Sequence, residues 1–233
     1  MIPLRDTIPS RTFPFINYTF ILLNLVVFFY QVSLGHHLER FIYAWGIVPA
    51  NFFAPFSYGQ PGLIERVIPL FTSMFLHGGW LHLLGNMLFL YIFGDNVEDR
   101  LGHTKYFFFY ILCGVLAVAA HLMTNPSSRV PTIGASGAIA GVMGAYFFLF
   151  PYARIVTLIF IFFFIDIIEI PAFFFLAFWL ILQFLNGTMS FSAQNAVSGG
   201  VAWWAHIGGF IAGILLLFVF GVRRTTRRLR LYS

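Results

Sequence analysis

Two side chains that could perform nucleophilic catalysis stand in apolar segments of this 233-residue chain. Ser136 offers a hydroxyl that a neighbouring base could activate, and His206 offers an imidazole, the side chain that titrates closest to neutral pH. Ser136 follows Gly134 closely and would begin a helix, where unpaired backbone N–H groups and the positive end of the helix dipole can stabilise an oxyanion. These residues predict a nucleophile, a base and part of an oxyanion hole.

A third polar cluster contains His77, His82 and Asn86, of which the last two lie four residues apart and so share one helix face. A metal site is not expected, because the spacing is not His-Glu-x-x-His and no carboxylate or thiol accompanies the histidines. No other cofactor is indicated. Position 138 is alanine, which excludes the Gly-x-Ser-x-Gly elbow of the α/β-hydrolases. Taken alone, a serine in a membrane helix is more often a packing residue. A histidine in such a helix more often forms a hydrogen bond to a neighbouring helix.

The elements that carry these residues must lie in lipid, because 60% of the chain is hydrophobic, only 9% is charged and 32 residues are phenylalanine. Four charge-free stretches each exceed the roughly 20 residues that cross a bilayer; they are residues 12–38, 67–94, 106–128 and 130–153. A fifth stretch, 170–222, is long enough for two crossings, with a loop rich in Asn, Ser and Gly at 186–200. The sequence predicts an all-α bundle of six transmembrane helices.

The fourth predicted helix is short. It begins at Ser136 after an irregular segment and lasts to about Phe150. Fifteen or so residues at 1.5 Å each cover roughly 22 Å, less than the hydrocarbon thickness of about 30 Å. We therefore expect its start to be recessed below the outer surface, where irregular backbone is tolerated only beside a cavity or inside protein.

Two other segments are not predicted to cross. The run 155–165 is closed by Asp166 and Glu169, and we place it at the membrane interface before the fifth helix. The segment 35–66 contains many aromatic residues among prolines and glycines, which indicates a partly buried, structured loop at the headgroup level. An aromatic belt and a gating role are both open for this loop.

The distribution of cations predicts the orientation, since short loops rich in Lys and Arg stay in the cytoplasm. With six crossings both termini lie on one side. Placing that side inside gives ten inner cations, namely Arg5, Arg11, Arg100, Lys105, Arg154 and five arginines after residue 222, against Arg40, Arg66 and Arg129 outside. Residues 1–14 would be a short cytoplasmic N-terminus, 15–221 the membrane domain, and 222–233 a basic cytoplasmic tail. The five arginines of this tail explain the net charge of +5. Nucleic acid is therefore not an expected partner.

In this topology the second, fourth and sixth helices run from outside to inside, so the three polar clusters lie at one depth. Glycines also follow Ser136 and His206 at spacings of four, which lets two helix backbones approach closely; they are Gly137, Gly141, Gly209 and Gly213. Helices four and six should therefore pack with Ser136 opposite His206. No acidic residue is expected at this depth, because Asp166 and Glu169 belong to the inner side, so the predicted catalytic unit is a dyad.

The motifs resemble those of the rhomboid family of intramembrane serine proteases over residues 15–220. The segment 134–137 with Gly141 is similar to the family's Gly-x-Ser-Gly motif, and Ala205-His206 with the two glycines after it is similar to the sixth-helix motif. Further similar positions are His77, His82, Asn86, Glu98, Gly102, Pro171, Ala172, Trp179 and Gln183. The resemblance implies a six-helix rhomboid-like bundle.

The resemblance also implies roles for individual residues. Ser136 would attack a peptide carbonyl with His206 as base, and His82, Asn86 and the Ser136 N–H would stabilise the oxyanion. His77 would hold the loop above the site. One departure concerns Ala140, since many members have an aromatic residue there that stacks on the histidine. The base could be held less tightly, or be supported by another aromatic side chain.

The substrates implied by the resemblance are single-span membrane proteins, cleaved near the outer face. The fifth helix and the loop 186–200 would form a lateral entrance and a cap. A non-catalytic rhomboid-like protein that binds membrane clients is the alternative, and a small transporter is a weaker one because the inner half of the spans offers few polar residues. The expected location is a prokaryotic plasma membrane, because neither a seventh span nor an Arg-rich leader is evident.

Overall fold

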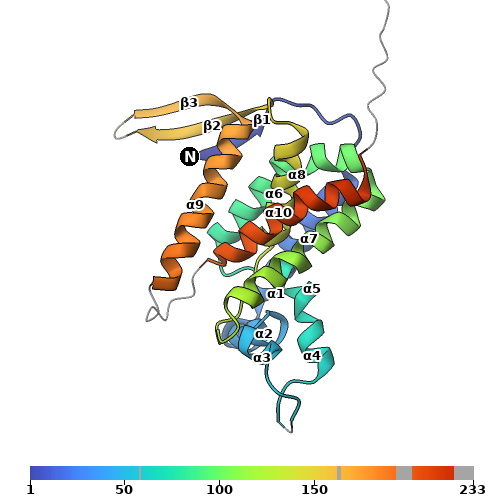
Figure 1. Ribbon diagram of the computed structural model, residues 1–233, viewed down its shortest axis with the longest axis vertical. Helices are drawn as coiled ribbons and strands as arrows, with labels where there is room; N and C mark the ends of the chain where they lie inside the picture. Colours follow the sequence, from blue (N-terminus) through green and yellow to red (C-terminus); the bar gives the residue numbers. More distant parts are fainter. Residues whose placement is uncertain (58, 162–163, 193–200, 223–233) are drawn as a thin grey trace, which may run out of the picture.

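The computed structural model describes residues 1–57, 59–161, 164–192 and 201–222. Within these ranges the chain is mostly helical, with a small antiparallel sheet at one end of the helical bundle (Figure 1). The α-helices are α1 (Phe15–Ser33), α2 (Leu38–Trp45), α3 (Pro49–Phe52), α4 (Leu63–Val67), α5 (Pro69–Thr72), α6 (Trp80–Leu101), α7 (His103–Thr124), α8 (Ser136–Leu149), α9 (Ala172–Ser192) and α10 (Trp203–Phe220). Short 3₁₀ helices are η1 (Gly35–His37) and η2 (Ser73–Phe75), and the strands are β1 (Ile2–Asp6), β2 (Arg154–Ile161) and β3 (Phe164–Pro171).

The long apolar helices occupy the segments that the sequence predicts as crossings. In the described residues α1, α7, α9 and α10 are each long and apolar enough to span a bilayer. Residues 63–75 and helix α6 qualify as a fifth span if they are counted as one element, although the two parts meet at a bend of 77°. Helix α8 is apolar but has only 14 residues. The structure thus supports four or five spans by length, and the six-crossing count stays a prediction.

The second long helix lies further along the chain than its charge-free stretch indicates. It begins at Trp80, after the extended Gly79, and continues through the acidic residues Asp95 and Glu98 to Leu101. Charge counting ends it too early because these acids have partners: Glu98, which is fully buried, accepts hydrogen bonds from the first backbone N–H groups of α1. Buried charges are tolerated where such partners exist.

The described residues of the run 155–165, which are 155–161, 164 and 165, belong to a sheet that the all-α expectation missed. Strand β2 pairs antiparallel with β1 on one side and with β3 on the other. β-Branched residues dominate both strands of this hairpin, and they favour extended backbone over helix. Ile155 and Thr157 are fully buried, so the sheet packs on the helices, and β1 draws the N-terminal residues into the fold (Figure 1).

The predicted loop at 186–200 is also shorter than expected, because helix α9 continues to Ser192. Side chains that hydrogen-bond to backbone within the helix, such as Asn186 to the Leu182 carbonyl, explain how polar residues are accommodated there. Residues 193–200 lie outside the described part of the chain.

In its described residues, 35–57 and 59–66, the segment 35–66 is a structured loop, as predicted, with short helices η1, α2, α3 and α4. The buried Arg66 connects several parts of this loop. Its guanidinium donates hydrogen bonds to the carbonyls of Phe52, Ala54 and Pro55. The guanidinium carbon also lies 4.0 Å from the ring centroid of Phe56. Cation–π contact and several carbonyl acceptors together compensate a buried cation.

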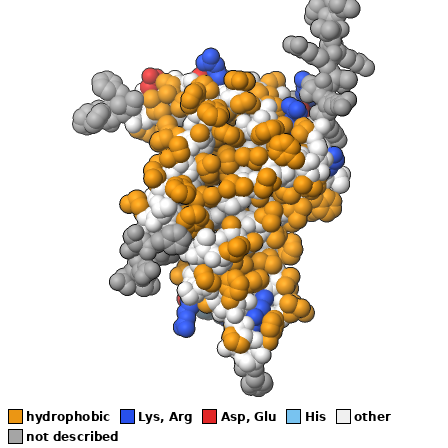
Figure 2. Space-filling model, in the orientation of Figure 1, with side chains coloured by type: hydrophobic (Ala, Val, Ile, Leu, Met, Phe, Trp, Pro, Cys, Tyr) orange, Lys and Arg blue, Asp and Glu red, His pale blue; other side chains and the backbone are white. Residues whose placement is uncertain are grey.

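This loop and the sheet lie at opposite ends of the molecule (Figure 1). Figure 2 shows hydrophobic side chains covering the face between the two ends, while Lys and Arg gather at the ends. An exposed apolar surface of this extent is typical of a protein whose solvent is lipid.

Candidate active site

Helix α8 is the core of the bundle, and Ser136 is its first residue. Every residue from 137 to 146 is buried, as expected for a helix that is apolar on all sides. Helix α10 makes its most extensive contact with α8, and α7 covers both. Ser136 therefore lies at the end of the most enclosed element of the fold.

Glycines allow α8 and α10 to touch through their backbones, as their spacing predicts. A Cβ atom on Gly209 would lie 2.1 Å from the Gly137 carbonyl oxygen, and one on Gly213 would lie 1.9 Å from that of Gly141. Neither approach is possible for a residue with a side chain. This close packing brings the helix of His206 against the helix of Ser136.

The loop before α8 is fixed at two points. Ile47 and Thr132 exchange backbone hydrogen bonds of 3.1 and 2.8 Å, and the Gly134 N–H donates to the Ser73 carbonyl at 2.9 Å. Gly134 has φ +130°, and a Cβ there would lie 2.8 Å from the His82 ring. Glycine at this position is thus required both by the backbone conformation and by the proximity of His82.

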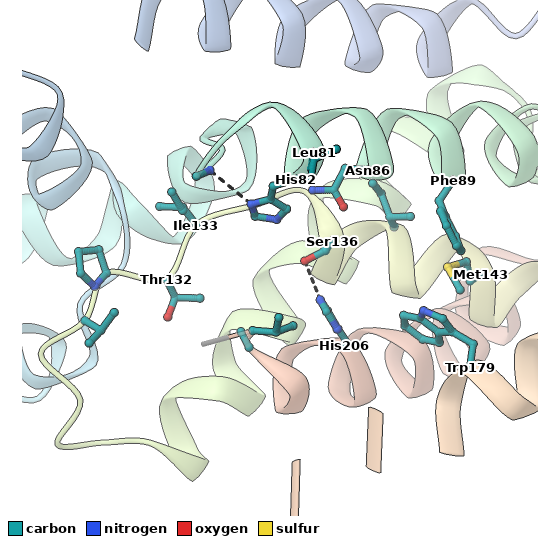
Figure 3. Close-up of a pocket in the computed structure, with 17 residues that line it drawn as sticks. Leu81, His82, Asn86, Phe89, Thr132, Ile133, Ser136, Met143, Trp179 and His206 are labelled. Atoms are coloured by element: carbon teal, nitrogen blue, oxygen red, sulfur yellow. Dashed lines mark hydrogen bonds between the residues drawn. The ribbon is translucent and has the colours of Figure 1, made fainter. Parts of the chain in front are cut away.

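Ser136 and His206 face each other at hydrogen-bonding distance, 2.7 Å between Ser136 Oγ and His206 Nε2 (Figure 3). They border a cavity of about 630 Å³, which the side chains of His82, Asn86 and Trp179 also line. The sequence predicts a common depth for Ser136, His206, His82 and Asn86, and the structure brings them together in one cavity. The apolar side chains of Phe89, Ile139 and Met143 also line this cavity.

His82 and Asn86 lie side by side on α6, across the cavity from His206 (Figure 3). The Gly78 N–H donates to His82 Nδ1 at 3.3 Å, so this nitrogen is the acceptor and Nε2 carries the proton. Asn86 Nδ2 is buried and has no hydrogen-bond partner among the described residues. The His82 ring and the Asn86 amide are thus the polar groups that α6 contributes to the cavity beside Ser136.

His77 does not line the cavity. Its backbone N–H donates to Gln31 Oε1 at 2.9 Å and its carbonyl accepts from Gln31 Nε2 at 3.1 Å, which ties the chain before α6 to α1. The His77 ring packs on the His82 ring, with 5.1 Å between centroids. This arrangement is consistent with a supporting position, away from the reacting atoms.

The aromatic support for His206 comes from other elements than the family resemblance implies. Ala140 is fully buried inside α8. The Trp179 ring on α9 lies 5.7 Å from the His206 ring, and Trp203 meets it edge-on at 6.2 Å. Of the two possibilities that Ala140 leaves open, the described residues provide the second, support by another aromatic side chain.

A third polar group contacts the histidine, which the prediction of a dyad did not include. Gln183 Oε1 lies 2.8 Å from His206 Nδ1. Sequence reasoning looked for a carboxylate at this depth and therefore passed over an amide. A signal was available, because Trp179 and Gln183 are four residues apart and so share the face of α9 that turns toward α10.

Comparison with known proteins gives the class to which this fold and site belong. Residues 65–223, more than half of the chain, match the family model described as Rhomboid domain. The chain belongs to the rhomboid family, and with its apolar helices it is an integral, multi-pass membrane protein.

Individual relatives come from mitochondria and from bacteria. The chain is 29% identical over 165 residues to Rhomboid protein 1, mitochondrial, of Saccharomyces cerevisiae, an alignment that covers 67% of this chain and 42% of that protein. It is 30% identical to YdcA of Bacillus subtilis, covering 64% and 65%, and 28% identical to Rhomboid protease GluP of the same organism, covering 58% and 25%. The chain thus spans less than two thirds of each of these relatives. Both Bacillus subtilis relatives have the word protease in their names, which supports a protease-like function for the family.

Proposed function

We propose that this protein is an intramembrane serine endopeptidase in which Ser136 is the nucleophile and His206 the general base. The observation that carries the proposal is the 2.7 Å contact between Ser136 Oγ and His206 Nε2 at the edge of a cavity. A nucleophile and a base within 2.6–3.2 Å are the geometric requirement for this chemistry.

In the proposed reaction Ser136 Oγ attacks the carbonyl carbon of the scissile peptide bond while its proton moves to His206 Nε2. The negative charge forms on the carbonyl oxygen, for which His82 Nε2–H, Asn86 Nδ2 and the Ser136 backbone N–H are the proposed donors. The C–N bond then breaks, and the imidazolium returns the proton to the leaving amine. Water, deprotonated by His206, hydrolyses the acyl-enzyme and restores both residues.

Single-span membrane proteins are the proposed substrates. Helix α8 has 14 residues and so measures about 21 Å, some 9 Å less than the hydrocarbon core. If its inner end reaches the inner boundary, Ser136 lies below the outer surface, where a helix-breaking segment of a substrate can unfold into the cavity. By the same reasoning, α8 is the proposed recessed fourth crossing, which brings the proposed number of crossings to six.

The proposed orientation has the sheet end of the bundle in the cytoplasm, in accord with the positive-inside rule. Lys105 Nζ donates to the Phe220 carbonyl, which places the start of α7 and the end of α10 at one end. A prokaryotic plasma membrane is retained as the proposed location.

The test is cleavage of a model single-span protein reconstituted in liposomes with the wild type, Ser136→Ala or His206→Ala. We expect the wild type to cut near the outer end of the substrate helix and both variants to lose activity by at least about 1,000-fold. Binding without cleavage by the wild type would favour the non-catalytic client-binding alternative. Undiminished cleavage by either variant would exclude the proposed pair.

A further inference from the structure

Gln183 is buried on α9 and makes two hydrogen bonds with its amide group. Its Nε2 lies 3.1 Å from the Trp179 carbonyl oxygen, one turn earlier in the same helix, and its Oε1 lies 2.8 Å from His206 Nδ1. The side chain is 6% exposed. The cavity that contains Ser136 is lined by Trp179 and His206 but not by Gln183.

These two contacts determine which atom of the amide faces which partner. The Trp179 carbonyl oxygen can only accept a hydrogen bond, so the atom opposite it must be the NH₂ group. The oxygen then has to face His206, and since an amide oxygen also only accepts, His206 Nδ1 must carry a proton. The neutral imidazole has one such proton, so Nε2 keeps its lone pair.

The lone pair of Nε2 is therefore directed at Ser136 Oγ, which is the tautomer that a general base needs. Without an acceptor at Nδ1, the proton could equally occupy Nε2 and the imidazole would become a donor to the serine. A carboxylate performs this orienting task in the usual triad, but an ionised carboxylate is costly at membrane depth. An amide avoids that cost because it is neutral.

The geometry points to Gln183 as a positioning residue that fixes the tautomer and the ring orientation of His206, completing a Ser-His-Gln arrangement. This inference rests on the proposed function of Ser136 and His206. The hydrogen bond from Nδ1–H to Gln183 becomes stronger when the ring becomes imidazolium. Its stabilising contribution therefore grows as the proton moves from the serine to His206 in the transition state. The effect is expected in kcat, since Gln183 lies outside the cavity that would hold the substrate.

Three variants separate this role from a packing role. Gln183→Leu removes the acceptor at similar size, and Gln183→Glu keeps an acceptor while adding a group that can ionise. Asn24→Leu is the matched control: Asn24 is buried on α1 and makes the same kind of bond to the carbonyl one turn earlier, 2.7 Å to Phe20, but it does not line the cavity. Gln183→Met takes the place of the leucine variant if that variant does not fold.

The measurements are kcat, KM and the pH dependence of cleavage of a single-span substrate in liposomes. We expect Gln183→Leu to lower kcat by about 10- to 100-fold with KM changed by less than about twofold. Gln183→Glu should keep kcat at least about threefold above that of Gln183→Leu. Its carboxylate favours the imidazolium, so the acid limb of the pH–rate profile should move up by about one pH unit. Asn24→Leu should match the wild type.

Two results would overturn the inference. The first is a wild-type kcat in Gln183→Leu. The second is a reduced kcat in Gln183→Leu that Gln183→Glu does not restore, together with an unshifted pH profile in Gln183→Glu. A packing role alone predicts this second pattern. The proposed function is tested separately by Ser136→Ala. If that variant is inactive while Gln183→Leu is fully active, only the role of Gln183 fails, whereas cleavage by Ser136→Ala removes the proposed function itself.

Discussion

Replacing Gly209 with alanine would separate the two helices that carry Ser136 and His206. The new methyl carbon would lie 2.1 Å from the Gly137 carbonyl oxygen, whereas carbon and oxygen in van der Waals contact are about 3.3 Å apart. The helices must therefore separate by about 1.2 Å. A sideways shift offers little relief, because the same methyl carbon would also lie 3.3 Å from the Ala117 Cβ.

This displacement acts directly on the proposed catalytic contact. Gly209 is one turn from His206, and Gly137 is adjacent to Ser136, so the 2.7 Å distance between Oγ and Nε2 could grow to about 3.9 Å. A misplacement of about 1 Å at reacting groups costs on the order of 100-fold in rate. Overpacking also destabilises a core by about 1–3 kcal/mol, which most folded proteins survive.

The assay is cleavage of a single-span substrate in liposomes, with thermal unfolding in detergent as a parallel measure of folding. Gly187→Ala is the control, because its added carbon would come no closer than 3.4 Å to the Trp203 side chain. We expect Gly209→Ala to remain folded with kcat reduced about 100-fold and Gly187→Ala to behave as the wild type. Wild-type kcat in a folded Gly209→Ala protein would refute the link between helix contact and catalysis.

Three other changes test separate parts of the account. Glu98→Ala leaves two N–H groups at the start of α1 without acceptors, so the free energy of unfolding should fall by about 3 kcal/mol in detergent, and an unchanged value would contradict this assignment. Burial raises the pKa of Asp6 above its ordinary 3.8, so its stabilising contribution is complete below about pH 3.8 and is lost as pH rises through the folded-state pKa. We expect the unfolding temperature of the wild type to fall between about pH 3.5 and about pH 6, and that of Asp6→Asn to fall less. An identical fall in both proteins would show that other groups cause it. Trp179→Leu should lower kcat about 10-fold by loosening the His206 ring, and a kcat within about twofold of the wild type would show that the ring needs no such support.

The apolar helices and their packing could be predicted because both follow from local rules. Hydrocarbon excludes charge, so gaps between charged residues locate α1, α7, α9 and α10. Glycines four residues apart mark close backbone approach, which predicts that the helices of Ser136 and His206 pack against each other. The grouping of His82, Asn86, Ser136 and His206 followed from the helix directions that the predicted spans impose.

The parts that could not be predicted depend on tertiary partners. Helix α6 continues through Glu98 because the distant N–H groups of α1 compensate this acid, and a count of charges along the chain does not include such groups. The hairpin of β2 and β3 was hidden because hydropathy does not distinguish a strand from a helix, while its β-branched residues do. Gln183 was missed as a partner of His206 because a neutral amide carries no electrostatic signature in sequence.

The central claim is that Ser136 is a nucleophile activated by His206, and covalent labelling tests it most directly. A fluorophosphonate reacts with an activated serine and leaves a phosphonyl group on Oγ, which peptide mass spectrometry locates. We predict a single adduct on Ser136 in the wild type, no adduct in Ser136→Ala, and labelling slowed at least about 100-fold in His206→Ala. An adduct at another residue, or unchanged labelling in His206→Ala, would contradict the claim.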